Sequence, residues 1–368
     1  MYNKHGDNME HVYIHIPFCR RICSYCDFCK MFYSEKLIDP YFEALKKEIE
    51  DFYEGEVLKT IYIGGGTPSM LNNKELNQLF EIIKIFKKQD DLEFSFECNP
   101  EDINLSFLEV LKKKGVNRLS IGIQSFNENK LKFMERQANY DDLKAKIKLA
   151  RSFGFDNINL DLMYGIPGES LIDLKKDLKL FLKLKPEHIS TYSLIVEDYT
   201  KIKIAGIKNN PEELDAKMYE YICKKLNRKG LKKYEISNFA ISGYESKHNL
   251  AYWDNKEYYG FGLGAAGYMN GFRYENTPNI NNYLEGKYRK NEALLSKREI
   301  MEHELILGFR KTRGINIKEF EEKYEITLAE AFPIKILIKN QDLILKKGHI
   351  FINPKRIYMM NEILLKMI

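Results

Sequence analysis

Four cysteines lie close together near the start of the chain. Cys19, Cys23, Cys26 and Cys29 fall within eleven residues, and the first three have the spacing Cys-x3-Cys-x2-Cys. Thiolates are the usual ligands of iron–sulfur clusters, and three cysteines would leave one iron of a four-iron cluster open to another ligand. An open coordination position is typical of a catalytic metal site. The alternative is a structural zinc site that uses all four cysteines, but zinc sites usually separate two short cysteine pairs by a longer loop, which this segment lacks.

Composition and charge narrow the class of protein. The chain has 368 residues, of which 44% are apolar and 30% charged, as is typical of a soluble globular protein. Lys and Arg (58) exceed Asp and Glu (53) by only 5, which does not favour a nucleic-acid binder. No apolar run is long enough for a membrane span, and the opening residues have no apolar signal-peptide core. The close cysteine cluster is unlike the disulfide framework of a secreted protein and, in a reducing compartment, indicates metal or redox chemistry. We therefore expect a cytoplasmic protein, for which peripheral contact with an anionic membrane is allowed but not required.

The first half of the chain alternates between strand and helix patterns. Apolar runs of strand length that alternate with segments of helical spacing predict a parallel sheet, because each crossover has to cover one of its faces. The pattern is compatible with an open doubly wound sheet or with a curved, partly closed barrel. The predicted strands are 11–16, 58–64, 92–97, 117–122, 157–162 and 188–194. The predicted helices are 41–53 (opening just after Pro40), 74–88, 103–115, 127–137, 140–154 and 171–184.

The pattern changes after about residue 200. One more amphipathic helix is predicted over 211–230, followed by a stretch rich in glycine and tyrosine over 234–275. Beyond it we expect a compact tail with helices at 296–311, 317–324 and 354–368 and a hairpin at 342–353. A small domain of winged-helix type fits this order. The sequence thus predicts two domains, residues 1–290 and 291–368.

The distinctive residues follow the predicted strands at their carboxyl ends. In parallel α/β folds, the loops that leave the strands at this edge form the ligand site, so these independent segments predict one site. Within it, the glycines at 64–66 would let the backbone turn sharply and approach a ligand. The segments are 17–29 with the cysteines, 64–69 (GGGTPS), 97–101 (ECNPE), 122–126 (GIQSF), 161–169 (DLMYGIPGE) and 192–198 (YSLIVED).

Together these motifs resemble the radical S-adenosylmethionine (SAM) superfamily. The resemblance is carried by Cys-x3-Cys-x-aromatic-Cys, with Tyr25 as the aromatic residue, followed by GGGTP. It implies a partial (β/α)6 barrel, in agreement with the predicted strands. It also implies that the amino and carboxylate groups of SAM chelate the open iron of a 4Fe-4S cluster. An electron from the reduced cluster would then cleave SAM to methionine and a 5′-deoxyadenosyl radical, which requires an electron donor.

Further motifs resemble the oxygen-independent coproporphyrinogen III oxidase group and its HemW branch. They are YIHIPFC, ECNP, RLSIGIQSF, the arginine at 136, DLMYGIPGE and YEISNFA, and the tail resembles the small C-terminal domain of the group. The resemblance implies that Cys19, Cys23 and Cys26 hold the cluster. It assigns SAM contacts to Tyr13, Gly65, Gly66, Thr67, Glu97, Gln124, Arg136 and Asp161.

The residue chemistry suits these assignments. Glu97 and Asp161 can accept hydrogen bonds from ribose hydroxyls or from the SAM ammonium, Arg136 can donate to the SAM carboxylate, and Gln124 can do either. An Arg or Glu is more often a solvated surface charge, but these follow the strand ends. Tyr13 points from a strand, and a simple role in the core is the alternative.

Two departures separate the branches of the group. The oxidase carries Cys-x3-Cys-x2-Cys-x-Cys and a longer N-terminal extension, whereas Phe28 takes the position of the last cysteine here and only 18 residues precede Cys19. Both favour HemW, which the resemblance describes as a haem-binding chaperone that delivers haem to acceptor proteins, and for which a homodimer is allowed. The enzymatic alternative is oxidative decarboxylation of coproporphyrinogen III propionates. A third is a zinc-stapled α/β protein without radical chemistry.

Two features of the sequence stay open. The segment 248–253 matches the HNxxYW motif of the HemW branch, and His248 is a predicted axial ligand of haem, with Tyr and Trp available to pack on the porphyrin. The alternative is a buried histidine in an aromatic core. Cys29 is a departure from the branch: it could be a spare thiol, could compete for the fourth iron or could be inert. Cys98 and Cys223 are interpreted as small buried residues.

Overall fold

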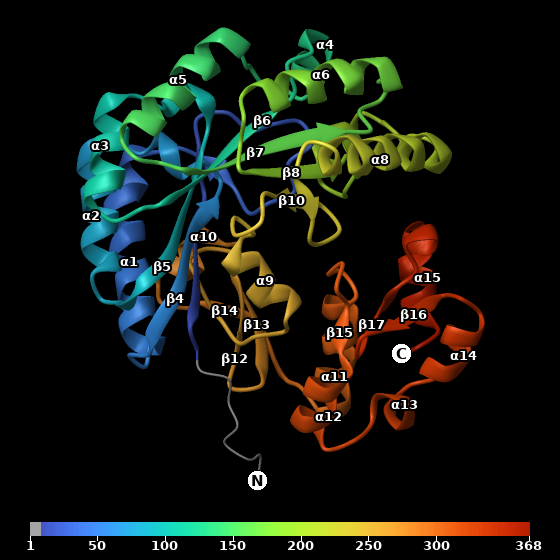
Figure 1. The fold of residues 1–368 in the computed structure, drawn as a ribbon. Coiled ribbons are helices and arrows are strands. Elements are labelled where there is room, and N and C mark those ends of the chain that lie inside the picture. Colours follow the sequence, from blue (N-terminus) through green and yellow to red (C-terminus); the bar gives the residue numbers. More distant parts are fainter. Residues whose placement is uncertain (1–8) are drawn as a thin grey trace.

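The computed structural model describes residues 9–368 and contains one large sheet, in which the predicted strands are confirmed (Figure 1). The sheet has nine strands, and six of them run parallel in chain order at its centre. These are β1 (His11–Ile16), β4 (Val57–Gly65), β5 (Lys87–Cys98), β6 (Arg118–Gln124), β7 (Asn157–Tyr164) and β8 (His188–Ser193).

Short strands extend the sheet at both edges. At one edge, β11 (Tyr259–Phe261) pairs in parallel with β1. At the other, β10 (Asn238–Ala240) runs antiparallel to β8 and to β9 (Lys232–Lys233). The sheet curves around an interior, as Figure 1 shows, and its two edge strands do not pair with each other. The curved, partly closed barrel is therefore the correct alternative.

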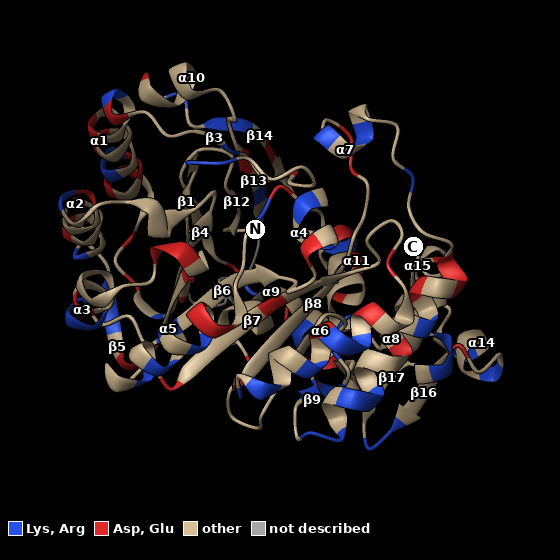
Figure 2. Cartoon of the chain, turned by 90° about the horizontal axis from the view of Figure 1, so that it is seen from above, with Lys and Arg blue, Asp and Glu red and all other residues tan. Residues whose placement is uncertain are grey.

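Helices cover the convex outer face of the sheet (Figure 1). Each strand turns apolar side chains outward against them, such as Leu119, Ile121 and Ile123 of β6, which are fully buried. Basic and acidic residues are interspersed along the helices in Figure 2. The helices of this layer are α1 (Glu35–Phe52), α2 (Asn73–Ile83), α3 (Leu105–Lys113), α4 (Glu128–Phe133), α5 (Tyr140–Ser152), α6 (Leu171–Lys183) and α8 (Glu212–Asn227). The short helix α7 (Lys201–Ile204) lies instead beside the cysteine loop, where the Ile202 N–H donates to the Ser24 carbonyl oxygen at 3.2 Å.

Two predicted helix boundaries are wrong. Helix α1 begins at Glu35 and contains Pro40, which is tolerated because the missing N–H lies near the helix start, where exposed carbonyls can bond to water. The predicted helix 74–88 ends at Ile83, since β5 begins at Lys87 and pairs there with Val57 of β4. A mixed apolar and basic run does not distinguish a helix end from a long strand.

A second sheet, which is antiparallel, follows the barrel along the chain. It consists of strands β12, β13 and β14. Helix α9 lies between the barrel strands β10 and β11 in the chain, and α10 lies between β13 and β14. The predicted domain boundary after residue 290 falls within β14, which pairs with β13, and the two-domain division stays a prediction. The bounds are α9 (Lys247–Trp253), β12 (Ala266–Met269), β13 (Phe272–Asn276), α10 (Ile280–Leu284) and β14 (Arg289–Leu294).

The C-terminal residues form a small α/β unit with an apolar core of its own. Its helices and the sheet β15-β17-β16 follow the order expected of a winged-helix-like domain. The last predicted helix is a 3-10 turn over Pro354–Met359 and then α15. None of the helices in residues 9–368 is long and apolar enough to cross a membrane. The elements are α11 (Lys297–Gly308), β15 (Ile315–Asn316), α12 (Ile317–Tyr324), α13 (Leu328–Ala331), α14 (Ile334–Lys339), β16 (Leu343–Lys346), β17 (His349–Ile352) and α15 (Met360–Leu365).

Candidate cofactor site

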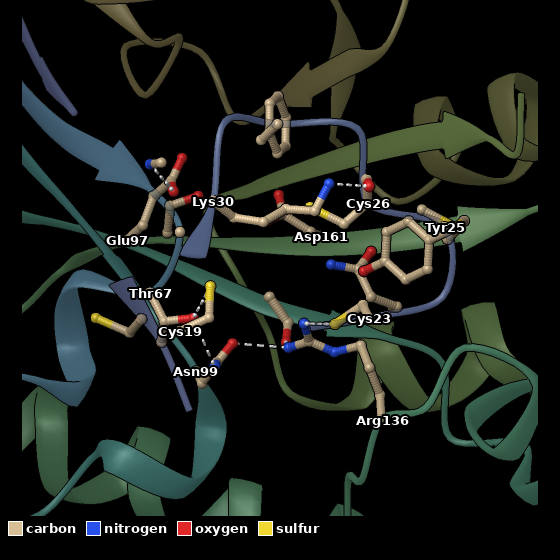
Figure 3. A pocket seen from close by; sticks show the side chains of 18 of the residues that line it. Cys19, Cys23, Tyr25, Cys26, Lys30, Thr67, Glu97, Asn99, Arg136 and Asp161 are labelled. Carbon is tan, nitrogen blue, oxygen red and sulfur yellow. Dashed lines mark hydrogen bonds between the residues drawn. The ribbon is translucent and has the colours of Figure 1, made fainter. Parts of the chain in front are cut away.

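A cavity of about 520 Å³ opens at the carboxyl ends of the parallel strands (Figure 3). Residues from all six predicted strand-end segments line it, as expected for a site at this edge. Most predicted site residues are brought together here, whereas Tyr13 and His248 are not among the lining residues. Those that line the cavity are Cys19, Cys23, Cys26, Gly65, Gly66, Thr67, Glu97, Gln124, Arg136 and Asp161.

The glycine loop holds the start of the cysteine loop. The backbone N–H groups of Gly66 and Thr67 donate to the carbonyls of Ile16 and Phe18, at 2.8 and 2.9 Å. A Cβ atom at Gly66 would lie 2.7 Å from the Phe18 carbonyl oxygen, so only glycine permits this approach. Gly65 has a φ of +114°, which a side chain would strain. The sequence GGGTP therefore fixes the position of Cys19 from the neighbouring strand.

The cysteine loop is closed at its base and anchored at its tip. Its base is the parallel pair β2 (Phe18–Cys19) and β3 (Met31–Phe32). At the tip, the Ser24 hydroxyl donates to the Phe133 carbonyl oxygen at 2.7 Å, which ties the loop to the end of α4. The Lys30 ammonium donates to the Cys26 carbonyl oxygen within the loop. These contacts hold the loop over the cavity.

The three thiols surround a space and do not converge on one point (Figure 3). The Cys19 sulfur accepts from the Thr67 hydroxyl at 3.5 Å, and the Cys23 sulfur accepts from Arg136 at 3.4 Å. No three His, Cys, Asp or Glu side chains within residues 9–368 are placed to hold a single metal ion. A zinc site needs its ligands around one ion, whereas cysteines of an iron–sulfur cluster bind different irons. The arrangement fits a cluster better than a zinc ion.

Arg136 forms a hydrogen-bonded bridge across the cavity wall. Its guanidinium donates to the Asn99 Oδ1 atom at 2.8 Å and to the Gly122 carbonyl oxygen at 2.5 Å, in addition to Cys23. The Asn99 amide in turn lies 3.5 Å from the Thr67 hydroxyl. Sequence reasoning had selected Arg136 but not Asn99. Its place in the ECNP motif, directly after a strand, was the signal that could have found it.

Two carboxyl groups face the cavity in a buried setting. The Glu97 carboxylate accepts from the Tyr62 hydroxyl at 2.8 Å and from the Gly65 N–H at 3.1 Å. Burial raises the pKa of Glu97 to about 7; these hydrogen bonds oppose the shift, and the nearby Asp161 charge adds to it. Burial also raises the pKa of Asp161, although the Asn159 amide donates to it at 2.8 Å. The pair therefore has unused capacity to accept hydrogen bonds from a bound ligand.

Gln124 is directed into the cavity by a strained backbone. Its φ is +71°, in the left-handed region, at the point where the register between β6 and β7 shifts. Such a conformation costs a non-glycine residue about 1–2 kcal/mol. The side-chain oxygen is buried without a hydrogen-bond partner in the described part of the chain. A strained residue with an unpaired acceptor facing a cavity indicates a binding role.

Tyr13 and His248 lie in the barrel interior, directly behind the cavity wall. The His248 ring stacks on the ring of Tyr62, a lining residue, at 5.2 Å between centroids, and the Tyr13 ring lies 6.1 Å from the same ring. The Tyr13 hydroxyl is 2.9 Å from the Nδ1 atom of His15. Both ring nitrogens of His248 are engaged, at 2.7 Å from the Thr60 hydroxyl and 2.8 Å from the Tyr252 hydroxyl. Of the HNxxYW segment, it is Asn249 that lines the cavity. Haem ligation by His248 stays a prediction, and it would need one of these two hydrogen bonds to be exchanged for the iron.

Cys29 is turned away from the other three cysteines. Its side chain packs against Gly264, where an added Cβ atom would lie 2.7 Å from the Cys29 sulfur. It is not among the residues that line the cavity. Burial raises the pKa of the Cys29 thiol to about 11. This position favours the inert alternative over competition for the fourth iron.

Comparison with known proteins assigns the family. Residues 13–181 match the model of the Radical SAM superfamily, and residues 295–355 match the HemN C-terminal domain. The heme chaperone HemW of Bacillus subtilis (strain 168) is 42% identical over 340 residues, which cover 88% of this chain and 89% of that protein. The chain belongs to the HemW family. The resemblance inferred from the motifs is thereby confirmed.

Further relatives agree with HemW membership. The heme chaperone HemW of Escherichia coli (strain K12) is 33% identical over 291 residues, covering 76% of this chain and 77% of that protein. Among solved structures, coproporphyrinogen III oxidase (HemN) from Escherichia coli has a TM-score of 0.86 and 21% identity, and the match covers 99% of this chain and 91% of that one. At this identity, the likeness bears on the fold. The predicted radical SAM barrel with a small C-terminal domain is confirmed.

Proposed function

We propose that this HemW-family protein is a haem chaperone. It would hold a 4Fe-4S cluster and SAM in the barrel cavity, bind haem and pass the haem to acceptor proteins, with an electron donor that reduces the cluster. The observation that carries the proposal is the set of three cysteines and seven further predicted cofactor residues around one cavity. The 42% identity to a relative named as a heme chaperone supports the haem-transfer part.

The cavity residues have distinct roles in this proposal. Cys19, Cys23 and Cys26 would hold the cluster, which would supply an open iron and a reducing electron for SAM. Arg136, fixed beside the Cys23 sulfur, would donate hydrogen bonds to the SAM carboxylate. Glu97 and Asp161 accept hydrogen bonds from the ribose hydroxyls or from the SAM ammonium.

The barrel wall completes the proposed SAM site. Gln124 offers its unpaired oxygen as an acceptor and its amide as a donor. Gly65, Gly66 and Thr67 supply the close backbone approach. Tyr13 acts from behind this shell, through its contact with His15.

The experiment that tests the function is a haem titration of the anaerobically reconstituted protein, followed by its Soret band. The proposal expects saturable binding and transfer of haem to a haem-depleted acceptor. A His248→Ala variant tests the predicted ligand, with His349→Ala as the matched control because the half-buried His349 lies in the β16–β17 hairpin, outside the cavity lining. Unchanged affinity and spectrum in His248→Ala would exclude His248 as the ligand.

The same preparation distinguishes the enzymatic alternative. Incubation with coproporphyrinogen III, SAM and a reductant measures decarboxylation of propionates. Turnover without saturable haem binding would overturn the chaperone proposal in favour of the oxidase. Haem binding and transfer without turnover is the expected result.

A further inference from the structure

Arg118 is a buried cation without a hydrogen-bonded partner. It opens β6, lines the inner end of the cavity and is only 2% exposed. Its Nε atom has no hydrogen-bond partner in residues 9–368, and no carboxylate there forms an ion pair with its guanidinium. Charged groups are almost never fully buried unless they are paired, and a guanidinium carries five donors. Arg118 is therefore prepared for an anion that residues 9–368 do not supply.

Lys130, a second deeply buried cation of the barrel, is paired with carboxylates and serves as a comparison for Arg118. Lys130 is 4% exposed, and its ammonium lies 2.6 Å from Glu169 and 2.9 Å from Asp177. Both carboxylates and the Met163 carbonyl satisfy it. Arg118 is equally buried and lacks such partners, so burial alone does not explain it.

The neighbouring acids do not occupy the Arg118 donors. Glu97 receives its hydrogen bonds from Tyr62 and Gly65, and Asp161 receives one from Asn159. The positive charge of Arg118 acts on both only at a distance, where it opposes the rise of their pKa values. Their negative charges would repel a doubly charged phosphate more strongly than a singly charged carboxylate. The charge balance thus favours a carboxylate as the missing anion.

We propose that Arg118 binds a carboxylate group of a ligand at the inner end of the cavity and, resting on the proposed function, that this group is a propionate of haem. A guanidinium can bind both carboxylate oxygens at once. Ser120 lies two residues along β6 and lines the same wall, where its hydroxyl accepts from Asn159 at 2.8 Å and keeps its own proton for donation. Haem would then be oriented by one propionate directed inward.

Haem and haem dimethyl ester, which lacks the propionate charges, are the probes that test this inference. Their dissociation constants are measured by Soret titration for the reconstituted wild type, Arg118→Gln, Arg118→Lys and a control arginine variant. The matched control is Arg228→Gln, since Arg228 is an exposed arginine at the end of α8 and does not line the cavity. We expect Arg118→Gln to weaken haem binding about 10- to 100-fold and to leave ester binding nearly unchanged.

The other variants and ligands separate the possible outcomes. Arg118→Lys keeps the positive charge but not the two-pronged guanidinium, so it should lose less haem affinity than Arg118→Gln. Arg228→Gln should bind haem as the wild type does. Circular dichroism and the thermal midpoint confirm that each variant is folded. The Arg118 inference would be overturned if the wild type bound haem and its ester equally, or if Arg118→Gln bound haem as the wild type does. Either result would leave the proposed function intact. Wild type that binds neither would overturn the proposed function.

SAM is the second source of a carboxylate in this cavity. Its binding is therefore compared with that of 5′-methylthioadenosine, which lacks the amino-acid group. A selective loss of SAM binding in Arg118→Gln, with haem binding unchanged, would overturn the assignment to a propionate. Unchanged binding of both SAM and methylthioadenosine supports it when haem affinity falls.

Discussion

The outer and inner faces of the parallel sheet are built from opposite kinds of residue. On β6 the outward side chains are Leu119, Ile121 and Ile123, all fully buried against helices. The inward positions of the same strand are Arg118 and Ser120, which line the cavity. Barrels of this class usually fill their interior with apolar side chains. Here the outer face supplies the folding energy, and the inner face is left polar for ligands.

The inner face itself divides into satisfied and unsatisfied groups. His248 has both ring nitrogens hydrogen-bonded, and its backbone N–H donates to Glu93 at 3.0 Å. Arg118 lies at the inner end of the cavity with its Nε unpaired in the described chain, and Gln124 has an unpaired oxygen. Both of these unpaired groups line the cavity, whereas His248 does not. The state of their hydrogen bonds therefore distinguishes these two candidate binding residues from His248, where residue type does not.

The largest effect is expected at the cysteines. Replacing Cys23 by Ser should abolish cluster assembly, because each cysteine is one of only three proposed ligands around the cavity. Cys29→Ser is the matched control, and it should retain full iron content because its side chain packs on Gly264. Iron analysis and the visible spectrum after anaerobic reconstitution measure both. Loss of iron in Cys29→Ser would show that the fourth cysteine also ligates the cluster.

Outer and inner faces should differ next in folding stability. Leu160 is fully buried on the outer face of β7, and Leu160→Ala should lower the free energy of unfolding by about 3 kcal/mol. Ser95, equally buried on the inner side of β5, has a hydroxyl without a partner in residues 9–368, so Ser95→Ala should change stability by about 0.5 kcal/mol or less. Urea denaturation of the ligand-free proteins measures the difference. Equal losses would contradict the division of roles between the faces.

Strand positions could be predicted well because alternation is a local property of the chain. Each of β1, β4, β5, β6, β7 and β8 carries a buried apolar run, and the chemical motifs follow these runs directly. Helix ends were less predictable, as at Pro40, since the competing strand or cap is decided by tertiary pairing. The convergence of the strand-end segments on one cavity followed from the parallel topology.

The partners of individual polar groups could not be predicted from sequence. Arg118 belongs to the motif RLSIGIQSF, but its burial without an ion pair depends on strands that lie far apart in the chain. The same holds for His248, whose hydrogen bonds go to Thr60 and Tyr252. A histidine motif is compatible with a haem ligand or with a core residue until such partners are known.

His248 should contribute to stability in its own right. His248→Ala leaves the Thr60 and Tyr252 hydroxyls without this partner inside the protein, which should cost about 2 kcal/mol of unfolding free energy. The control His349→Ala, at a half-buried position of the β16–β17 hairpin, should change the free energy of unfolding by about 0.5 kcal/mol or less. Denaturation of ligand-free protein measures this effect separately from any haem ligation. A fully stable His248→Ala protein would place His248 with the binding residues.

The Glu97 carboxyl should make stability depend on pH. Its pKa is raised to about 7 by burial, so the folded state holds a proton that the unfolded state releases. Stability from this group is present at low pH and is lost as the pH rises through about 7. The stability of ligand-free Glu97→Gln relative to the wild type should therefore increase by about 2 kcal/mol as the pH is raised from about 5 to about 8. A difference that does not vary with pH would contradict the raised pKa.

The smallest effect should come from Arg118 in the absence of ligand. Because its guanidinium is buried without an ion pair in the described residues, Arg118→Gln removes a desolvated charge and no direct contact. Its distant attraction to Glu97 and Asp161 is lost at the same time, so the two changes oppose each other. We expect Arg118→Gln to change the free energy of unfolding by no more than about 1 kcal/mol, as measured by urea denaturation. Lys130→Gln should lose markedly more stability, because the Lys130 ammonium pairs with two buried carboxylates. A comparable loss in both variants would mean that Arg118 is a structural cation, and the contrast within the inner face would then rest on Gln124 alone.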